Sequence, residues 1–150
     1  MTVAKSERLR LDDQLCFALY AASNEIVRSY RLRLGEIGLT YPQYLVMLVL
    51  WQDATSTMQQ IADRLMLGQN AITPLINRLR EAGFVTRNRN DEDRRIVRIA
   101  LTDAGRALEK PASEIQHGVA CNTGLLEADL AVLREELLTL AQTLRTPSRS

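Results

Sequence analysis

The stretch from Thr57 to Thr102 constrains the fold of this chain more than any other. It opens with a capping box, Thr57-Met58-Gln59-Gln60, in which the threonine hydroxyl can accept from the third helical N–H and Gln60 can reach back. A short helix follows and ends near Leu67-Gly68. A second helix is predicted from about Gln69 to Ala82, because apolar residues recur there at i, i+3, i+4 and i+7, and Gly83 is suited to end it.

Two predicted strands follow this helix pair, at about 84–87 and 96–101, and the charged segment 88–95 joins them as a hairpin. Two short helices with a turn between them and then a basic hairpin form a winged helix-turn-helix. The fold class predicted is therefore mainly α with a small β-hairpin wing. The function that this arrangement favours is DNA binding.

The outward face of the second helix carries amide, hydroxyl and guanidinium groups, which can reach base edges and phosphates. Between Arg78 and Arg98 there are seven arginines against four acids, and such a local excess raises DNA affinity through counterion release. A charged hairpin alone would indicate only a solvated surface, but the preceding helix pair favours the DNA interpretation. The candidate contacts on the helix and the first strand are Gln69, Asn70, Thr73, Asn77, Arg78, Arg80 and Arg87.

Helices are predicted on both sides of this lobe. The first begins at Asp12 or Asp13, either of which can cap it, and continues to about Glu36; the second is capped by Thr40 and includes the apolar run 44–51. Residues 53–56 are expected to be a polar link. After the hairpin we expect a helix at about 104–116 that Pro111 interrupts, a turn-like segment at 117–124, and a last helix at about 127–144. An irregular arm at 1–11 and a disordered tail at 146–150 complete the prediction.

These terminal helices exceed what a small winged domain must bury, which suggests a two-fold homodimer. Such a dimer can place two recognition helices in successive major grooves about 34–36 Å apart. The predicted organisation is a single domain over residues 1–150, with a DNA-binding lobe at about 57–102. The dimerisation helices would lie at about 11–36 and 104–145.

The composition is that of an ordinary globular protein, 46% hydrophobic and 25% charged, with a net charge of +1. The longest apolar run, 44–51, is too short to span a bilayer, and no signal-peptide pattern opens the chain. We therefore expect a cytoplasmic protein with no membrane partner.

The chain has two cysteines, Cys16 and Cys121, and one histidine, His117, too few for a four-ligand zinc site. No metal or other cofactor is predicted. Both cysteines could be small buried hydrophobes. For Cys16 the start of the first helix favours a thiolate, although Asp12 and Asp13 oppose that effect.

Tyr30 shares a helical stripe with Cys16 but lies fourteen residues further on, roughly 21 Å along a straight helix. The two side chains cannot touch within one chain. In a dimer whose first helices run antiparallel, Tyr30 of one subunit could reach Cys16 of the other, and its hydroxyl would then hold the thiolate ionised.

Two segments, Leu15 to Ser23 and Leu39 to Trp51, resemble the MarR family of winged-helix repressors, and more narrowly its organic hydroperoxide resistance regulators. Three shorter motifs fall where that family has its recognition helix, its wing tip and its strand end: Thr73-Pro74-Leu75, Asp93-Arg94-Arg95 and Leu101-Thr102. The resemblance covers about residues 11–124. The chain departs from the family pattern at Gly68-Gln69-Asn70, where an acid and small residues are usual, and at Asn77, where a basic residue is common.

The resemblance implies roles for individual residues. Cys16 corresponds to the peroxide-sensing cysteine, and Tyr30 and Tyr41 to the tyrosines that hydrogen-bond that sulfur from the other subunit. Cys121 corresponds to the resolving cysteine of the two-cysteine branch. At the wing, Arg95 would enter the minor groove with Asp93 orienting it, and Arg94 would contact phosphate.

The predicted function is a redox-sensing repressor that binds operator DNA as a reduced homodimer. An organic hydroperoxide would oxidise Cys16, a disulfide with Cys121 of the partner subunit would release the DNA, and a thiol reductant would reverse the change. Two alternatives stay open: a MarR-type repressor released by a small aromatic ligand, and a thiol peroxidase with no DNA role. Because the sequence shows no Ser-His-Asp set and no phosphate-binding glycine loop, we do not expect an enzyme.

Overall fold

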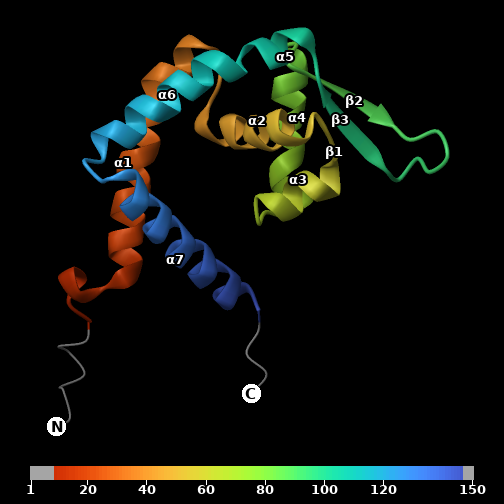
Figure 1. Ribbon diagram of the computed structural model, residues 1–150. Helices are drawn as coiled ribbons and strands as arrows, with labels where there is room; N and C mark the ends of the chain where they lie inside the picture. Colours follow the sequence, from red (N-terminus) through yellow and green to blue (C-terminus); the bar gives the residue numbers. More distant parts are fainter. Residues whose placement is uncertain (1–8, 147–150) are drawn as a thin grey trace. The chain divides into compact units, whose positions relative to one another are not determined.

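The computed structural model describes residues 9–146 and shows a mainly helical chain with one small antiparallel sheet (Figure 1). The predicted arm at 1–11 and tail at 146–150 fall outside this range, apart from residues 9–11 and 146. The elements in chain order are η2 (Leu11–Asp13), α1 (Leu15–Glu36), α2 (Tyr41–Asp53), β1 (Thr55–Thr57), α3 (Met58–Arg64), α4 (Gln69–Glu81), β2 (Val85–Arg89), β3 (Val97–Leu101), α5 (Asp103–Ala107), α6 (Glu109–Asn122) and α7 (Glu127–Arg145). This architecture confirms the predicted fold class.

The chain forms two compact units, of which the first ends at Gln116 and the second begins at His117. The division falls inside α6. No described helix is long and apolar enough to cross a membrane.

Local hydrogen bonds explain where α2 and α3 begin. Thr57 and Gln60 form the predicted capping box, with bonds of 2.8 and 3.1 Å, and Thr40 and Gln43 form a second one at the start of α2. The predicted cap of α1 is wrong. Asp12 and Asp13 lie in η2, a short 3-10 turn, and the N-cap residue of α1 is Gln14.

The sheet has the strand order β1-β3-β2, and β1 is a strand where a polar link was expected. The prediction failed because the partner of β1 is remote in sequence: Thr55 pairs with Ala100, and Ser56 is only 2% exposed. Backbone pairing with β3 satisfies the polar groups of this short segment.

The helices after the sheet also differ from expectation. The interruption lies at Leu108, before Pro111, because this proline has no N–H to donate to the carbonyl of Ala107 and its ring would clash with that carbonyl. Pro111 is accommodated in the first turn of α6. The expected turn at 117–124 is wrong, since α6 continues to Asn122 and places Cys121 in its last turn.

The core of the first unit lies between α2, α3, α4 and β3. The predicted apolar stripe of α4 is confirmed, since Ile72, Ile76 and Leu79 are buried. The fully buried side chains around it include Leu34, Val46, Met47, Leu50, Ile61 and Ile99. Burial of this stripe turns the polar side of α4 outward.

At Gly105, α5 packs closely against the rest of this unit. A Cβ atom at this position would lie 2.1 Å from the carbonyl oxygen of Phe84, and the indole N–H of Trp51 donates to the Gly105 carbonyl at 3.0 Å. This close approach holds the end of the wing against α2.

Candidate nucleic-acid interface and thiol residues

The outward face of α4 is continuous but does not include every predicted residue. At about 100° per residue, Asn70, Thr73, Asn77 and Arg80 lie on one side of the helix, whereas Arg78 is rotated by about 100° from Asn77. Asn70, Arg78 and Arg80 are exposed, and Thr73 and Asn77 are half-buried. The structure therefore brings four of these side chains together on one side of α4, and Arg78 projects from a different side of the helix.

Gln69 is the first residue of α4 and is joined to α3 by side-chain hydrogen bonds. Its Nε2 donates to Oε1 of Gln59, and Nε2 of Gln59 donates in turn to Oδ1 of Asp63 at 2.7 Å. Gln59 and Asp63 were not predicted as site residues. Their i,i+4 spacing, which places both on one face of a helix, was the available signal.

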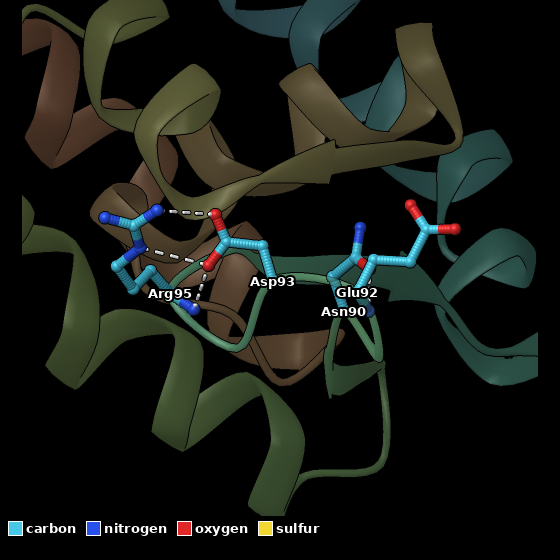
Figure 2. A network of polar contacts seen from close by, with 4 residues as sticks. All are labelled: Asn90, Glu92, Asp93 and Arg95. Carbon is cyan, nitrogen blue, oxygen red and sulfur yellow. Dashed lines mark hydrogen bonds and ion pairs between the residues drawn. The ribbon is translucent and has the colours of Figure 1, made fainter.

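The wing tip holds a paired arginine (Figure 2). Nε and Nη2 of Arg95 each donate to a carboxylate oxygen of Asp93 at 3.0 Å, and the backbone N–H of Arg95 donates to Oδ1 at the same distance. The guanidinium lowers the pKa of Asp93, and the carboxylate raises the pKa of Arg95. The Arg95 side chain is nevertheless 91% exposed. Asp93 therefore orients Arg95 while leaving it accessible.

Two further arginines connect the wing to itself and to α4. Arg87 Nη1 donates to Oδ1 of Asn77 at 3.5 Å, which ties β2 to the outward face of α4. Arg89 Nη1 donates to the backbone carbonyl of Arg94 at 3.3 Å, and Arg94 is exposed.

A groove of about 360 Å³ lies between the start of α3, the front of α4 and the wing. Its polar lining comes from Thr57, Gln59, Gln69, Thr73, Arg87, Arg95 and Arg98. Arg98 was not predicted as a site residue, because its place in a strand gave no separate signal. The groove gathers amide and guanidinium donors on the face that carries the predicted recognition helix.

Both cysteines are free and exposed, which contradicts the interpretation that they are buried hydrophobes. Cys16 is the second residue of α1. Cys121 lies in the second compact unit, and its Sγ is 3.7 Å from Nε2 of His117, one helical turn earlier. This contact between His117 and Cys121 was not predicted from the sequence.

Tyr30 and Tyr41 come together in an aromatic cluster with Tyr44. The ring centroid of Tyr30 lies 5.4 Å from that of Tyr41 and 5.2 Å from that of Tyr44. The ring of Trp51 lies beyond Tyr44, tilted against it with the centroids 6.2 Å apart. Burial raises the pKa of all three tyrosines, and an interaction with Tyr44 partly offsets this rise for Tyr30. Tyr44 was missed as a member of this site, although its i,i+3 spacing from Tyr41 predicts contact along one helix face.

Comparison with known proteins places this geometry among transcriptional regulators. The family model described as transcriptional regulator SarA/Rot matches residues 28–110. The chain is 37% identical over 140 residues to the organic hydroperoxide resistance transcriptional regulator of Bacillus subtilis (strain 168), covering 93% of this chain and 95% of that protein. It is 42% identical over 145 residues to the HTH-type transcriptional regulator TtmR of Methylorubrum extorquens (strain PA1), covering 92% and 74% of the two chains.

Among solved structures, the chain resembles AbfR of Staphylococcus epidermidis. The reduced form of AbfR bound to DNA superposes with a TM-score of 0.78 at 34% identity, covering 95% of this chain and 99% of that one. AbfR has also been solved with a disulfide formed, and that form superposes with a TM-score of 0.64 at 34% identity, covering 94% of each chain.

Proposed function

The chain belongs to the MarR family of winged-helix transcriptional regulators, and from this premise we propose that it is a repressor switched by organic hydroperoxides. The reduced homodimer binds operator DNA, and oxidation of Cys16 releases it. The observation that carries this proposal is the free, exposed thiol of Cys16 in the first turn of α1, in a chain 37% identical to an organic hydroperoxide resistance regulator. The disulfide-forming relative AbfR supports it.

The proposed chemistry uses two thiols and one hydroperoxide. The Cys16 thiolate attacks the terminal peroxide oxygen, the O–O bond breaks and the alkoxide leaves, so that a sulfenic acid remains on Cys16. The alkoxide becomes the alcohol by taking up the proton that Cys16 had released to water. The Cys121 sulfur of the partner subunit then attacks the Cys16 sulfur, the S–O bond breaks, and hydroxide leaves and becomes water by taking up the proton that Cys121 releases through His117. The products are one disulfide, one alcohol and one water. A dithiol reductant restores both thiols by exchange.

His117 is the group placed to take the Cys121 proton, because its Nε2 contacts Sγ. A thiolate is the nucleophile in disulfide formation, so a base at this position favours the second step.

Tyr30 and Tyr41 support the Cys16 thiolate of the partner subunit in this proposal. The rise of α1 separates Tyr30 from Cys16 of its own chain by roughly 21 Å. Their rings lie in one cluster, with centroids 5.4 Å apart, which supports a site where one thiolate meets both residues. Dimerisation through α1, α6 and α7 would bring that thiolate from the other subunit.

At the DNA, the first residues of α4 enter the major groove. Arg95, oriented by Asp93, enters the minor groove beside the wing, and Arg94 and Arg87 contact phosphate. The solved complex of reduced AbfR with DNA supports this assignment of the reduced state.

The test is DNA binding to the region upstream of the gene, before and after one equivalent of cumene hydroperoxide, with non-reducing gels in parallel. Wild type should release the DNA, form a linked dimer and recover with dithiothreitol. Cys16→Ser should stay bound. Cys121→Ser should form no linked dimer. Release of Cys16→Ser to the same extent as wild type would overturn the redox proposal.

A second candidate is a regulator of the same family that a small aromatic ligand releases. A cavity of about 350 Å³ favours it, since Tyr44 and Trp51 line one side and Glu109 another. Under this candidate, peroxide would leave DNA binding of wild type unchanged, and a ligand seated against Trp51 would quench its fluorescence.

A further inference from the structure

The hydrogen-bonded row Asp63–Gln59–Gln69 has a fixed direction. A carboxylate only accepts hydrogen bonds, so Asp63 requires the amino group of Gln59 on its side. The carbonyl oxygen of Gln59 must then face α4, where it accepts from the amino group of Gln69. Without the carboxylate at its end, either amide could rotate by 180° and exchange its donor for its acceptor.

This direction decides what Gln69 presents outward. One of its two N–H donors is occupied by Gln59, which leaves its carbonyl oxygen and the other N–H available. Gln69 lines the groove between α4 and the wing, and it is the first residue of α4. In helix-turn-helix proteins the first residues of the recognition helix contact base edges.

An adjacent acceptor and donor on one amide match the major-groove edge of adenine, which offers N7 as acceptor and N6 as donor. Guanine offers two acceptors there, so the Gln69 carbonyl would face another oxygen. Cytosine offers only its amino donor, and thymine its carbonyl acceptor and a methyl group. Adenine alone satisfies both remaining groups of this amide.

We propose that Gln69 reads an adenine in each half-site, and that Asp63 acts through Gln59 as the positioning residue that sets this preference. The inference rests on the proposed function, since it requires that α4 enters the major groove. It adds a determinant that lies on α3 and touches no base. Gln69 supplies the contact, and Gln59 and Asp63 supply its orientation.

The experiment is selection of bound duplexes from a random library by the reduced protein, followed by binding measurements on the selected site with single base changes. Wild type should select a site with an adenine at one position of each half. Replacing that adenine by guanine should weaken wild-type binding about tenfold, the effect of a bidentate contact near the lower end of its usual range. Gln69→Ala should keep the rest of the site and lose this preference.

Asp63→Asn tests the positioning role, because the side chain keeps its size but can donate as well as accept. The preference for adenine over guanine should fall from about tenfold toward onefold. The matched control is Asp129→Asn, the same change at an exposed position in the first turn of α7, which should keep the full preference. Gln69→Glu, which can only accept, should shift the preference toward cytosine.

The outcomes separate the inference from the function on which it rests. Wild type that selects no site overturns the proposed function and this inference with it. If Gln69→Ala binds the selected site with the same preference for adenine as wild type, the inference is overturned and the proposed function stands. If Asp63→Asn keeps the tenfold preference while Gln69→Ala loses it, the positioning role of Asp63 is wrong.

Discussion

In the proposed mechanism, the contact between Cys121 and His117 lets a residue that forms no bond in the reaction take up the thiol proton. The two side chains lie one turn apart at the end of α6, and 3.7 Å separates sulfur from nitrogen. Glu114, one turn before His117, is the nearest carboxylate along the same helix. Because both groups are exposed, a thiol proton can pass to the imidazole and on to water.

The first prediction concerns His117. His117→Gln should slow the linking of the two subunits about tenfold at pH 7, because the Cys121 thiol loses its base, an effect near the lower end for a positioned general base. The measurement is the rate of disulfide formation after one equivalent of cumene hydroperoxide, followed on quenched non-reducing gels. The rate of Cys16 oxidation, followed by a sulfenic-acid trap, should not change.

The control is Gln116→Ala, the neighbouring exposed position. Equal rates for wild type and His117→Gln at pH 7 would show that the contact has no role.

At the scale of elements, the pairing of α1 with α2 produces the tyrosine cluster. Tyr30 comes from α1, whereas Tyr41 and Tyr44 come from the first turn of α2, which the Thr40 capping box begins. The rings bury one another, so the neutral hydroxyls are favoured over the phenolates. The same packing that orders the hydroxyls makes them resistant to ionisation.

This gives the second prediction, on stability against pH. The folded-state pKa of each tyrosine is raised above its ordinary value of 10.0, so the folded chain holds protons that the unfolded chain loses. Their contribution is complete below about pH 10 and is lost as the pH rises toward the folded-state values. The free energy of unfolding in urea should fall above pH 10, by up to about 1.4 kcal/mol per pH unit for each tyrosine.

Tyr44→Phe removes one ionising group from the cluster and should make this decline shallower. Tyr20→Phe is the control, since Tyr20 is exposed and lies outside the cluster. Equal slopes for wild type and Tyr44→Phe above pH 10 would contradict the prediction.

At the scale of the whole molecule, many large apolar side chains remain exposed on the terminal helices. On α1 they include Leu15, Phe17 and Tyr20, and on α7 they include Leu133, Leu137, Leu138 and Leu144. Exposed large apolar side chains of this kind, on each of the two helices, mark an interaction site. In the proposed dimer these helices meet, which also brings Cys16 and Cys121 from different subunits together.

The third prediction tests the dimer. Leu137→Glu places a charge on the leucine stripe of α7 and should weaken dimerisation at least tenfold, because a buried unpaired charge is costly. Thr139→Glu adds the same charge at an exposed position about 160° around the helix and should have little effect. Sedimentation equilibrium measures both, and DNA affinity should fall with dimer content. A Leu137→Glu protein that stays dimeric would exclude this face of α7 from the interface.

Much of the candidate site follows from residues close together in sequence. The capping boxes span three residues, the buried stripe of α4 follows helical periodicity, and Asp93 reaches Arg95 across two positions. Such features depend on local backbone geometry, which residues close together in sequence determine. The winged helix and its outward face could therefore be predicted without coordinates.

Other features depend on segments that are distant in sequence. The strand β1 exists because β3 pairs with it. The indole N–H of Trp51 donates to the carbonyl of Gly105, which is 54 residues away in sequence. Gln59 meets Gln69 only because α3 and α4 pack against each other. Hydrophobic periodicity and capping motifs carry no information about such contacts between residues that are distant in sequence. Only the packed chain shows which polar groups satisfy one another across it.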